Sequence, residues 1–228
     1  MLTVDDRRIE IFISHKVDMM PLIITVDDKD GKMISELTKK LTDRPFILAC
    51  IKDISWMDEL SPWPTKALSN REDSPKGDAD SFLTYIITKA MPAIKTYLLE
   101  KHDVTIDRYF IAGYSMAGLF ALYSAYKSDI FTGFISASGS LWYEGLLDFI
   151  KTHAVSKKIR YAYFSLGNKE AHTKNKLLST VEERTEKIVA HLKDQDIETI
   201  FEMNDGGHFK DTKLRLAKGI AWILNMRT

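Results

Sequence analysis

Hydrophobic residues recur along this chain with two periods, one typical of strands and the other typical of helices. Short runs rich in Ile, Val and Phe predict strands at residues 8–15, 21–27, 46–51, 107–113, 131–137, 160–166 and 197–203. Apolar positions at helical spacing predict helices at residues 34–41, 79–100, 119–127, 146–153, 181–192 and 214–224. Because the two kinds of element alternate, we expect an α/β fold with a mostly parallel central sheet and helices on both of its faces.

Three stretches depart from this simple alternation. A short connection that contains Lys16 and Asp18 separates the first two predicted strands, so we expect these strands to pair antiparallel. Pro92 lies inside the helix expected at 79–100 and predicts a kink or a break into two helices. Residues 52–78 have no periodicity and are rich in turn residues, and a segment of this length inside a compact domain is usually functional.

The clearest chemical signal is the junction between the strand at 107–113 and the helix that follows it. Gly113 stands two residues before Ser115, and Ala117 and Gly118 follow that serine. Small residues at these places are typical of a nucleophile elbow, the sharp turn that holds a serine hydroxyl out of the sheet beside a base. The usual pattern has glycine where Ala117 stands, so one extra methyl group slightly crowds the turn. An ordinary buried turn is the alternative, whereas the spacing of a dinucleotide-binding turn is absent.

The composition excludes several classes of partner and cofactor. Lys plus Arg and Asp plus Glu both number 32, so no overall field attracts nucleic acid or an anionic membrane. We therefore expect a neutral or modestly charged small-molecule substrate. No His or Cys pair has the spacing of metal ligands and no phosphate-binding loop is present, so neither a metal nor another cofactor is expected.

Length and cysteine content predict a single soluble domain. The 228 residues are enough to bury one core, and we expect one domain over residues 1–228. The lone Cys50 cannot form an internal disulfide, which is compatible with the cytoplasm. A charged N-terminus and the lack of any apolar run of about 18 residues argue against a signal peptide and a membrane span. The oligomeric state stays open, a homodimer included.

Three candidate catalytic residues follow predicted strands in the order nucleophile, acid, histidine: Ser115, Glu170 and His208. This is the chain order of the α/β-hydrolase arrangement, in which the histidine takes the serine proton and the carboxylate orients the imidazole. His208 comes after Asp205-Gly-Gly207, in a loop between the last strand and the last helix. The acid stays open between Glu170, Asp205 and Asp211, since either aspartate could instead cap a turn or the last helix.

Two further groups of residues are expected around this centre. The oxyanion hole should use the N–H of Met116, directly after the nucleophile, and a second N–H from residues 53–55, for which we take Ile54. Tyr114 and the tryptophans Trp56, Trp63 and Trp142 are expected to wall a substrate pocket. The alternative for these tryptophans is that they only pack the loops onto the sheet.

Four segments together are similar to one family. Residues 113–122, Ser138-Gly-Ser-Leu-Trp-Tyr143, Ser165-Leu-Gly-Asn-Lys-Glu170 and Gly206-Gly-His208 resemble the esterase group of α/β-hydrolases that includes the enterochelin esterase-like and esterase D-like enzymes. The resemblance implies an α/β-hydrolase fold without a separate lid domain, and a carboxylic ester hydrolase with Ser115 and His208 catalytic and Glu170 in the acid role. Basic and acidic residues are equal in number, so the sequence gives no sign of a basic surface that would bind a triply anionic ferric siderophore. We therefore expect a general small-ester substrate.

Two other functions fit the same residues. An acyltransferase would use the same three residues but pass the acyl group to an alcohol rather than to water. A binding or interaction protein could retain the fold without catalysis, a reading motivated by the imperfect elbow and the open choice of acid. Loss of turnover on removal of the Ser115 hydroxyl would separate an enzyme from a binding protein.

Overall fold

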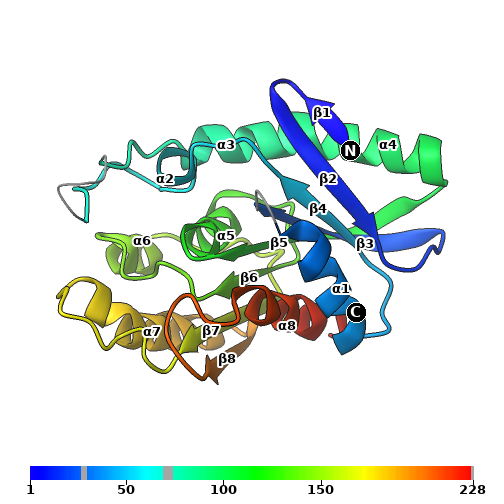
Figure 1. Ribbon diagram of the computed structural model, residues 1–228. Coiled ribbons are helices and arrows are strands. Elements are labelled where there is room, and N and C mark those ends of the chain that lie inside the picture. The colour runs from blue at the N-terminus through cyan, green and yellow to red at the C-terminus, as the bar shows by residue number, and fades with distance from the viewer. Residues whose placement is uncertain (27–29, 69–73, 227–228) are drawn as a thin grey trace.

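The computed structural model of the chain describes residues 1–26, 30–68 and 74–226. The strands of these residues form an eight-stranded sheet in the order β1-β2-β4-β3-β5-β6-β7-β8 (Figure 1). β2 runs antiparallel to β1 and β4, and the other neighbouring pairs are parallel, which confirms the predicted α/β class. The strands are β1 Leu2–Val4, β2 Arg7–Ile13, β3 Met19–Val26, β4 Ile47–Ile51, β5 Thr105–Tyr114, β6 Gly133–Ala137, β7 Tyr161–Gly167 and β8 Glu198–Asn204.

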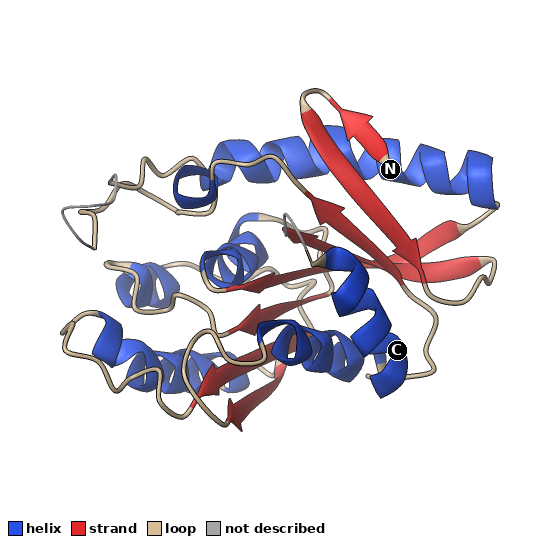
Figure 2. Cartoon of the chain, viewed as in Figure 1, coloured by secondary structure: helices blue, strands red, loops and turns tan. Residues whose placement is uncertain are grey.

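Helices cover both faces of the sheet, and each face carries its own buried apolar cluster (Figures 1 and 2). On one face α1 and α8 pack together through Ile34, Leu216 and Ile220. On the other face the cluster includes Phe82 and Phe120, from α3 and α5. The helices are α1 Gly31–Leu41, α2 Trp56–Glu59, α3 Ala79–Tyr85, α4 Met91–His102, α5 Met116–Lys127, α6 Leu146–Thr152, α7 Val181–Lys193 and α8 Thr212–Leu224, with the short turns η1 Ile86–Ala90 and η2 Leu178–Thr180.

The expected pairing of the first two predicted strands is wrong. β2 pairs with β1 and β4, whereas β3 lies between β4 and β5. Residues 20–26 are buried, as in a central strand covered on both faces, while β2 is mostly half-buried and lies near the edge. β1, with three residues, is too short to give a periodic signal and lies outside the predicted strands. Asp27, the last residue of the predicted strand 21–27, lies outside the described residues.

The helix predicted at 79–100 is divided near Pro92. α3 ends at Tyr85, the π-helical turn η1 follows, and α4 begins at Met91 with Pro92 in its first turn. The three segments follow one another without a gap, and the Met91 N–H donates to Ile86 O, five residues earlier. A π-helical turn of this kind is a common local irregularity of a helix beside a proline, which has no N–H to donate.

The segment 52–78 holds one short helix, α2, in its described part. Residues 69–73, which include the turn residues expected at 70–73, lie outside the described residues. Ser55 precedes α2, and its N–H donates to the carboxylate of Glu59 at 2.7 Å, which satisfies one amide at the start of the helix. This segment brings Trp56 beside Ser115, as described below.

Candidate active site

The turn between β5 and α5 holds Ser115 in an uncommon backbone conformation. Its φ is 60° and its ψ is −121°, a region that residues other than glycine rarely adopt. The Ser115 N–H donates to Ala137 O at 3.1 Å, and the Ser115 carbonyl accepts from the N–H groups of Gly118, Leu119 and Ser140. Bonds from both the following helix and the neighbouring strand therefore hold the turn in place.

Close contacts explain the small residues on either side of Ser115. A Cβ added at Gly113 would lie 2.1 Å from the backbone C and O of Ala117, and one at Gly118 would lie 2.9 Å from Gly139 Cα. The Ala117 side chain is itself buried in the core. The extra methyl group fits because Gly113, which faces it, has no side chain.

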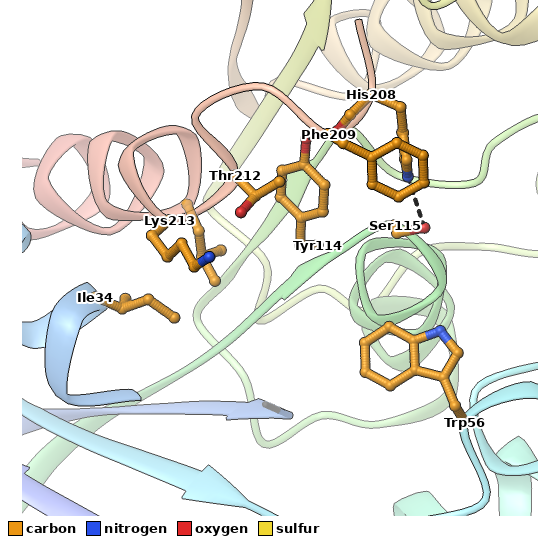
Figure 3. Close-up of a pocket in the computed structure, with 9 residues that line it drawn as sticks. Ile34, Trp56, Tyr114, Ser115, His208, Phe209, Thr212 and Lys213 are labelled. Carbon is orange, nitrogen blue, oxygen red and sulfur yellow. Dashed lines mark hydrogen bonds between the residues drawn. The ribbon is translucent and has the colours of Figure 1, made fainter. Parts of the chain in front are cut away.

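Hydrogen bonds join Ser115, His208 and Glu170 in one chain. Ser115 Oγ lies 3.0 Å from His208 Nε2, the bond drawn as a dashed line in Figure 3. His208 Nδ1 lies 2.7 Å from Glu170 Oε2. Ser115 follows β5, Glu170 follows β7 and His208 follows β8, so the three side chains meet at the carboxyl ends of parallel strands. Functional groups of open α/β sheets gather at this edge.

Glu170 is buried yet ionised. Burial alone would raise its pKa, but hydrogen bonds from His208, the Gly167 N–H and the Ser138 hydroxyl outweigh it, and the pKa is lowered. Glu170 Oε1 accepts from Gly167 N at 2.6 Å and from Ser138 Oγ at 2.8 Å. An ionised carboxylate only accepts hydrogen bonds, so Nδ1 of His208 donates its proton to Glu170. In the neutral imidazole Nε2 then carries no proton and accepts from the Ser115 hydroxyl.

Arg215 on α8 contacts this centre and was not among the predicted residues. Its side chain is 1% exposed, and Nη1 donates to Glu170 Oε1 at 2.8 Å. Nη2 donates to the carbonyls of Asp205 and Gly207, both at 3.1 Å, in the loop that carries His208. Arg215 thus holds the carboxylate and the histidine loop together. In the sequence it stands between Leu214 and Leu216, and Lys213 and Lys218 on the same helix give it no distinguishing signal.

The two alternative candidates for the acid, Asp205 and Asp211, have other surroundings than Glu170. Asp205 is exposed and pairs with Lys210 Nζ at 2.5 Å. Asp211 is exposed at the start of α8. The carboxylate beside His208 is therefore that of Glu170.

Two cavities meet at Ser115 and His208. Their volumes are about 280 Å³ and about 340 Å³, and both are lined by Trp56, Ser115, His208 and Phe209. Of the other predicted pocket residues, Tyr114 lines the smaller cavity and Trp142 the larger. Figure 3 shows the smaller cavity, with Trp56 and Phe209 on opposite sides of Ser115.

Trp63 lies elsewhere and lines neither of these two cavities. Its ring packs against Tyr123, Tyr143 and Phe149, and its Nε1–H donates to Glu144 O at 2.9 Å. This tryptophan fixes a loop to the α5 and α6 side of the sheet, which is the packing alternative for such residues.

The amides expected to form an oxyanion hole differ in their surroundings. Met116 is the first residue of α5, where the N–H has no partner within the helix, and the residue lines the larger cavity. In the loop after β4 the Ser55 N–H is taken by Glu59. Ile54 packs its side chain against the core cluster.

No group of three or more His, Cys, Asp and Glu side chains in the described ranges is arranged to hold a metal ion. Within the same part of the chain, no helix combines the length and the apolar character needed to cross a bilayer.

Comparison with known sequences does not show a family for this chain. No family model matches the chain. A protein of Bacillus subtilis described as uncharacterized protein YbbA is 26% identical over 152 residues, which cover 65% of this chain and 59% of that protein. The chain thus matches less than two thirds of the length of this relative.

Comparison with solved structures is decisive for the fold. An IroE-like serine hydrolase from Shewanella oneidensis matches with a TM-score of 0.78 and 17% identity, over 96% of this chain and 75% of that one. The siderophore hydrolase EstA from Aspergillus nidulans matches with a TM-score of 0.73 and 17% identity, over 97% and 91% of the two chains. The chain has the α/β-hydrolase fold. The enterobactin esterase FES from Shigella flexneri, in the presence of enterobactin, matches with a TM-score of 0.70 and 20% identity, over 95% and 54%.

The α/β-hydrolase fold confirms the fold class predicted from the sequence. By name, the three structural neighbours are a serine hydrolase, a siderophore hydrolase and an enterobactin esterase, and the four sequence segments resemble an esterase group that includes enterochelin esterase-like enzymes. In this fold the nucleophile, acid and histidine follow one another along the chain at strand ends. Ser115, Glu170 and His208 have this order.

The lowered pKa of Glu170 predicts a loss of stability in acid. Ionised Glu170 stabilises the fold above the ordinary value of 4.5, and this contribution is lost as the pH falls through the lower pKa of the folded chain. The free energy of unfolding, measured with urea between about pH 3 and pH 7, should therefore fall in acid more steeply for the native chain than for Glu170→Gln. Glu100→Gln, at an exposed position on α4, is the control and should keep the native slope. Equal slopes for the native chain and Glu170→Gln would contradict the prediction.

Proposed function

We propose that the chain is a serine hydrolase that cleaves a carboxylic ester through an acyl-enzyme on Ser115. His208 is the general base and Glu170 orients it. The observation that carries the proposal is the continuous chain of bonds from Ser115 Oγ to His208 at 3.0 Å and from His208 to Glu170 at 2.7 Å. The names of the structural neighbours, esterases and serine hydrolases, support the same class of reaction.

Acylation begins at the Ser115 hydroxyl. Oγ adds to the carbonyl carbon of the ester while its proton passes to His208 Nε2. Glu170, already bonded to Nδ1, stabilises the imidazolium that forms. His208 then returns the proton to the oxygen of the departing alcohol, the carbon–oxygen bond of the ester breaks, and the acyl group stays on Ser115.

The negative charge that develops on the carbonyl oxygen needs donors fixed before the reaction. The N–H of Met116 is the first donor, because it has no intrahelical partner and Met116 lines the larger cavity. We assign the second donor to the N–H of Ile54, since the neighbouring Ser55 amide is already bonded.

Deacylation repeats the same proton transfers with water. A water molecule gives one proton to His208 Nε2 and adds to the acyl carbon. When the second intermediate collapses, His208 returns the proton to Ser115 Oγ and the carboxylic acid leaves. An alcohol in place of this water would give acyl transfer, and the ratio of ester to acid formed with an added alcohol measures that branch.

Covalent labelling tests the nucleophile directly. A fluorophosphonate should form one adduct, located on Ser115 by mass spectrometry of a digest, because its phosphorus is attacked by an activated serine. His208→Ala should label much more slowly, since the base is lost. Ser124→Ala, on the helix that follows Ser115 and with its hydroxyl hydrogen-bonded to Phe120 O, should label like the native chain. An unmodified Ser115 in folded protein would refute the acyl-enzyme.

A further inference from the structure

The two cavities beside Ser115 diverge from a common centre. Beyond the four residues they share, the larger one extends past Met116 toward η2 and the start of α7, where Leu178 and Val181 line it. The smaller one extends past Tyr114 toward α1 and the start of α8, where Ile34 and Thr212 line it. Figure 3 shows Ile34, Thr212 and Lys213 on the far side of Tyr114 from His208. A carbon bonded to Ser115 Oγ would therefore have space on two sides.

Each cavity is walled mainly by apolar side chains. Met57, Trp142, Leu178 and Val181 face the larger cavity, and Ile34, Tyr114 and Leu216 face the smaller one. The volume of about 280 Å³ lies just below, and that of about 340 Å³ near the bottom of, the roughly 300–1,000 Å³ common for small-molecule sites. Each half therefore suits one modest apolar group rather than a whole large ligand.

The charged residues that line the cavities in the described part of the chain already have partners. Lys213 Nζ pairs with Asp30 Oδ2 at 3.1 Å, and Glu170 pairs with His208 and Arg215. A charged group on the substrate would lose its hydration on binding. The opposite charge that it would meet in either cavity already has a partner. Burial of such a group is unfavourable.

We propose that the site takes an uncharged ester in two halves, with its acyl part in one cavity and its alcohol part in the other, each half carrying an apolar group. This inference rests on the proposed esterase function and deepens it by naming the substrate class. The exposed rings of Trp56 and Phe209, which line both cavities, form the shared rim over the scissile carbonyl.

Two cavity-filling variants test the division into halves. Leu178→Trp fills the larger cavity and Thr212→Trp the smaller one, and Met203→Trp, at an exposed position on β8, is the matched control. For each we would measure kcat/KM for 4-nitrophenyl esters of increasing acyl length and for butyrate esters of increasing alcohol size.

The expected result is crossed selectivity. One variant should lose roughly tenfold to a hundredfold in kcat/KM for long acyl groups while its preference among alcohols stays native, and the other should show the reverse. The Met203→Trp control should keep both native preferences. The proposal is overturned if both cavity-filling variants lower kcat/KM for large groups in the same half of the ester, or if neither variant changes the preference for acyl length or alcohol size.

A charge comparison tests the uncharged substrate. The native chain should hydrolyse 4-nitrophenyl pentanoate with a kcat/KM roughly tenfold or more above that of the 4-nitrophenyl monoester of glutaric acid, which adds one carboxylate at similar length. Equal or higher kcat/KM for the anionic ester overturns this part. If Ser115 forms a fluorophosphonate adduct and esters are cleaved, such results refute the substrate class alone. If no adduct forms and no ester is cleaved, the proposed function fails and this inference fails with it.

Discussion

Ser115→Ala should lower kcat for a 4-nitrophenyl ester by about four to six orders of magnitude while the chain stays folded. The reason is that His208 and Glu170 act only through the hydroxyl that this change removes. The effects of substituting residues that act as such a unit are not additive. The substitution removes one oxygen from a half-buried residue whose backbone bonds to Ala137 and Gly118 stay in place. The unfolding transition should therefore remain close to native.

The control for this experiment is Ser124→Ala, the same change on α5. Its hydroxyl donates to Phe120 O within the helix and faces no cavity beside Ser115. Its kcat should stay within a few-fold of native. The Ser115→Ala, His208→Ala double variant should lose little beyond the single change. Native turnover in folded Ser115→Ala would show that Ser115 is not the nucleophile. No turnover in the native chain, with ligand binding unchanged by Ser115→Ala, would favour the alternative of a binding protein that retains the fold.

The parts of the fold with strong local signals could be predicted from the sequence. β5 is an apolar run that ends at a turn with small residues on both sides, and the contacts at Gly113 show why nothing larger fits there. Glu170 and His208 were predicted because each follows a strand, and the structure brings both to Ser115. Their catalytic roles stay predictions until labelling and kinetics are measured.

The remaining parts depend on tertiary contacts that a local pattern does not contain. Pairing between strands is set by which strand is covered on both faces, so β3 takes the centre although β2 precedes it in the chain. Trp63 carries the same local signal as Trp56, yet it packs against Tyr143 and Phe149, while Trp56 reaches the cavities. Position within a loop does not decide which of two tryptophans faces the substrate.

Arg215 is the clearest case of such a residue. Lysine and arginine on a terminal amphipathic helix are usually solvated, and α8 also carries Lys213 and Lys218. The carboxylate that pairs with Arg215 lies 45 positions earlier in the chain. Only the folded chain shows that this arginine faces inward.

Arg215→Met should lower the free energy of unfolding at pH 7 by about 3–5 kcal/mol, because it leaves a buried carboxylate without its cation. The side chains of Arg215 and Glu170 are 1% and 4% exposed, so solvent does not screen the lost pair. The carbonyls of Asp205 and Gly207 lose their donor in the same step. Urea unfolding at equilibrium measures the change.

Lys218→Met supplies the matched control on the same helix. Lys218 Nζ pairs with Glu202 Oε1 at 2.5 Å, but these two side chains are 35% and 32% exposed. Exposed pairs contribute about 0–1 kcal/mol, so the loss should be small. Arg215→Lys should lie between the two, since an ammonium keeps the charge but cannot reach the carboxylate and both carbonyls in the geometry of the guanidinium.

The pH dependence of the Arg215→Met effect separates charge from packing. Below the pKa of Glu170 the carboxyl is neutral, so the loss of its cation matters less and the native chain and the variant should approach each other in stability. A packing defect would keep the same difference at every pH. A difference equal to that of Lys218→Met at pH 7, or one that does not narrow in acid, would show that Arg215 does not stabilise the fold through the charge on Glu170.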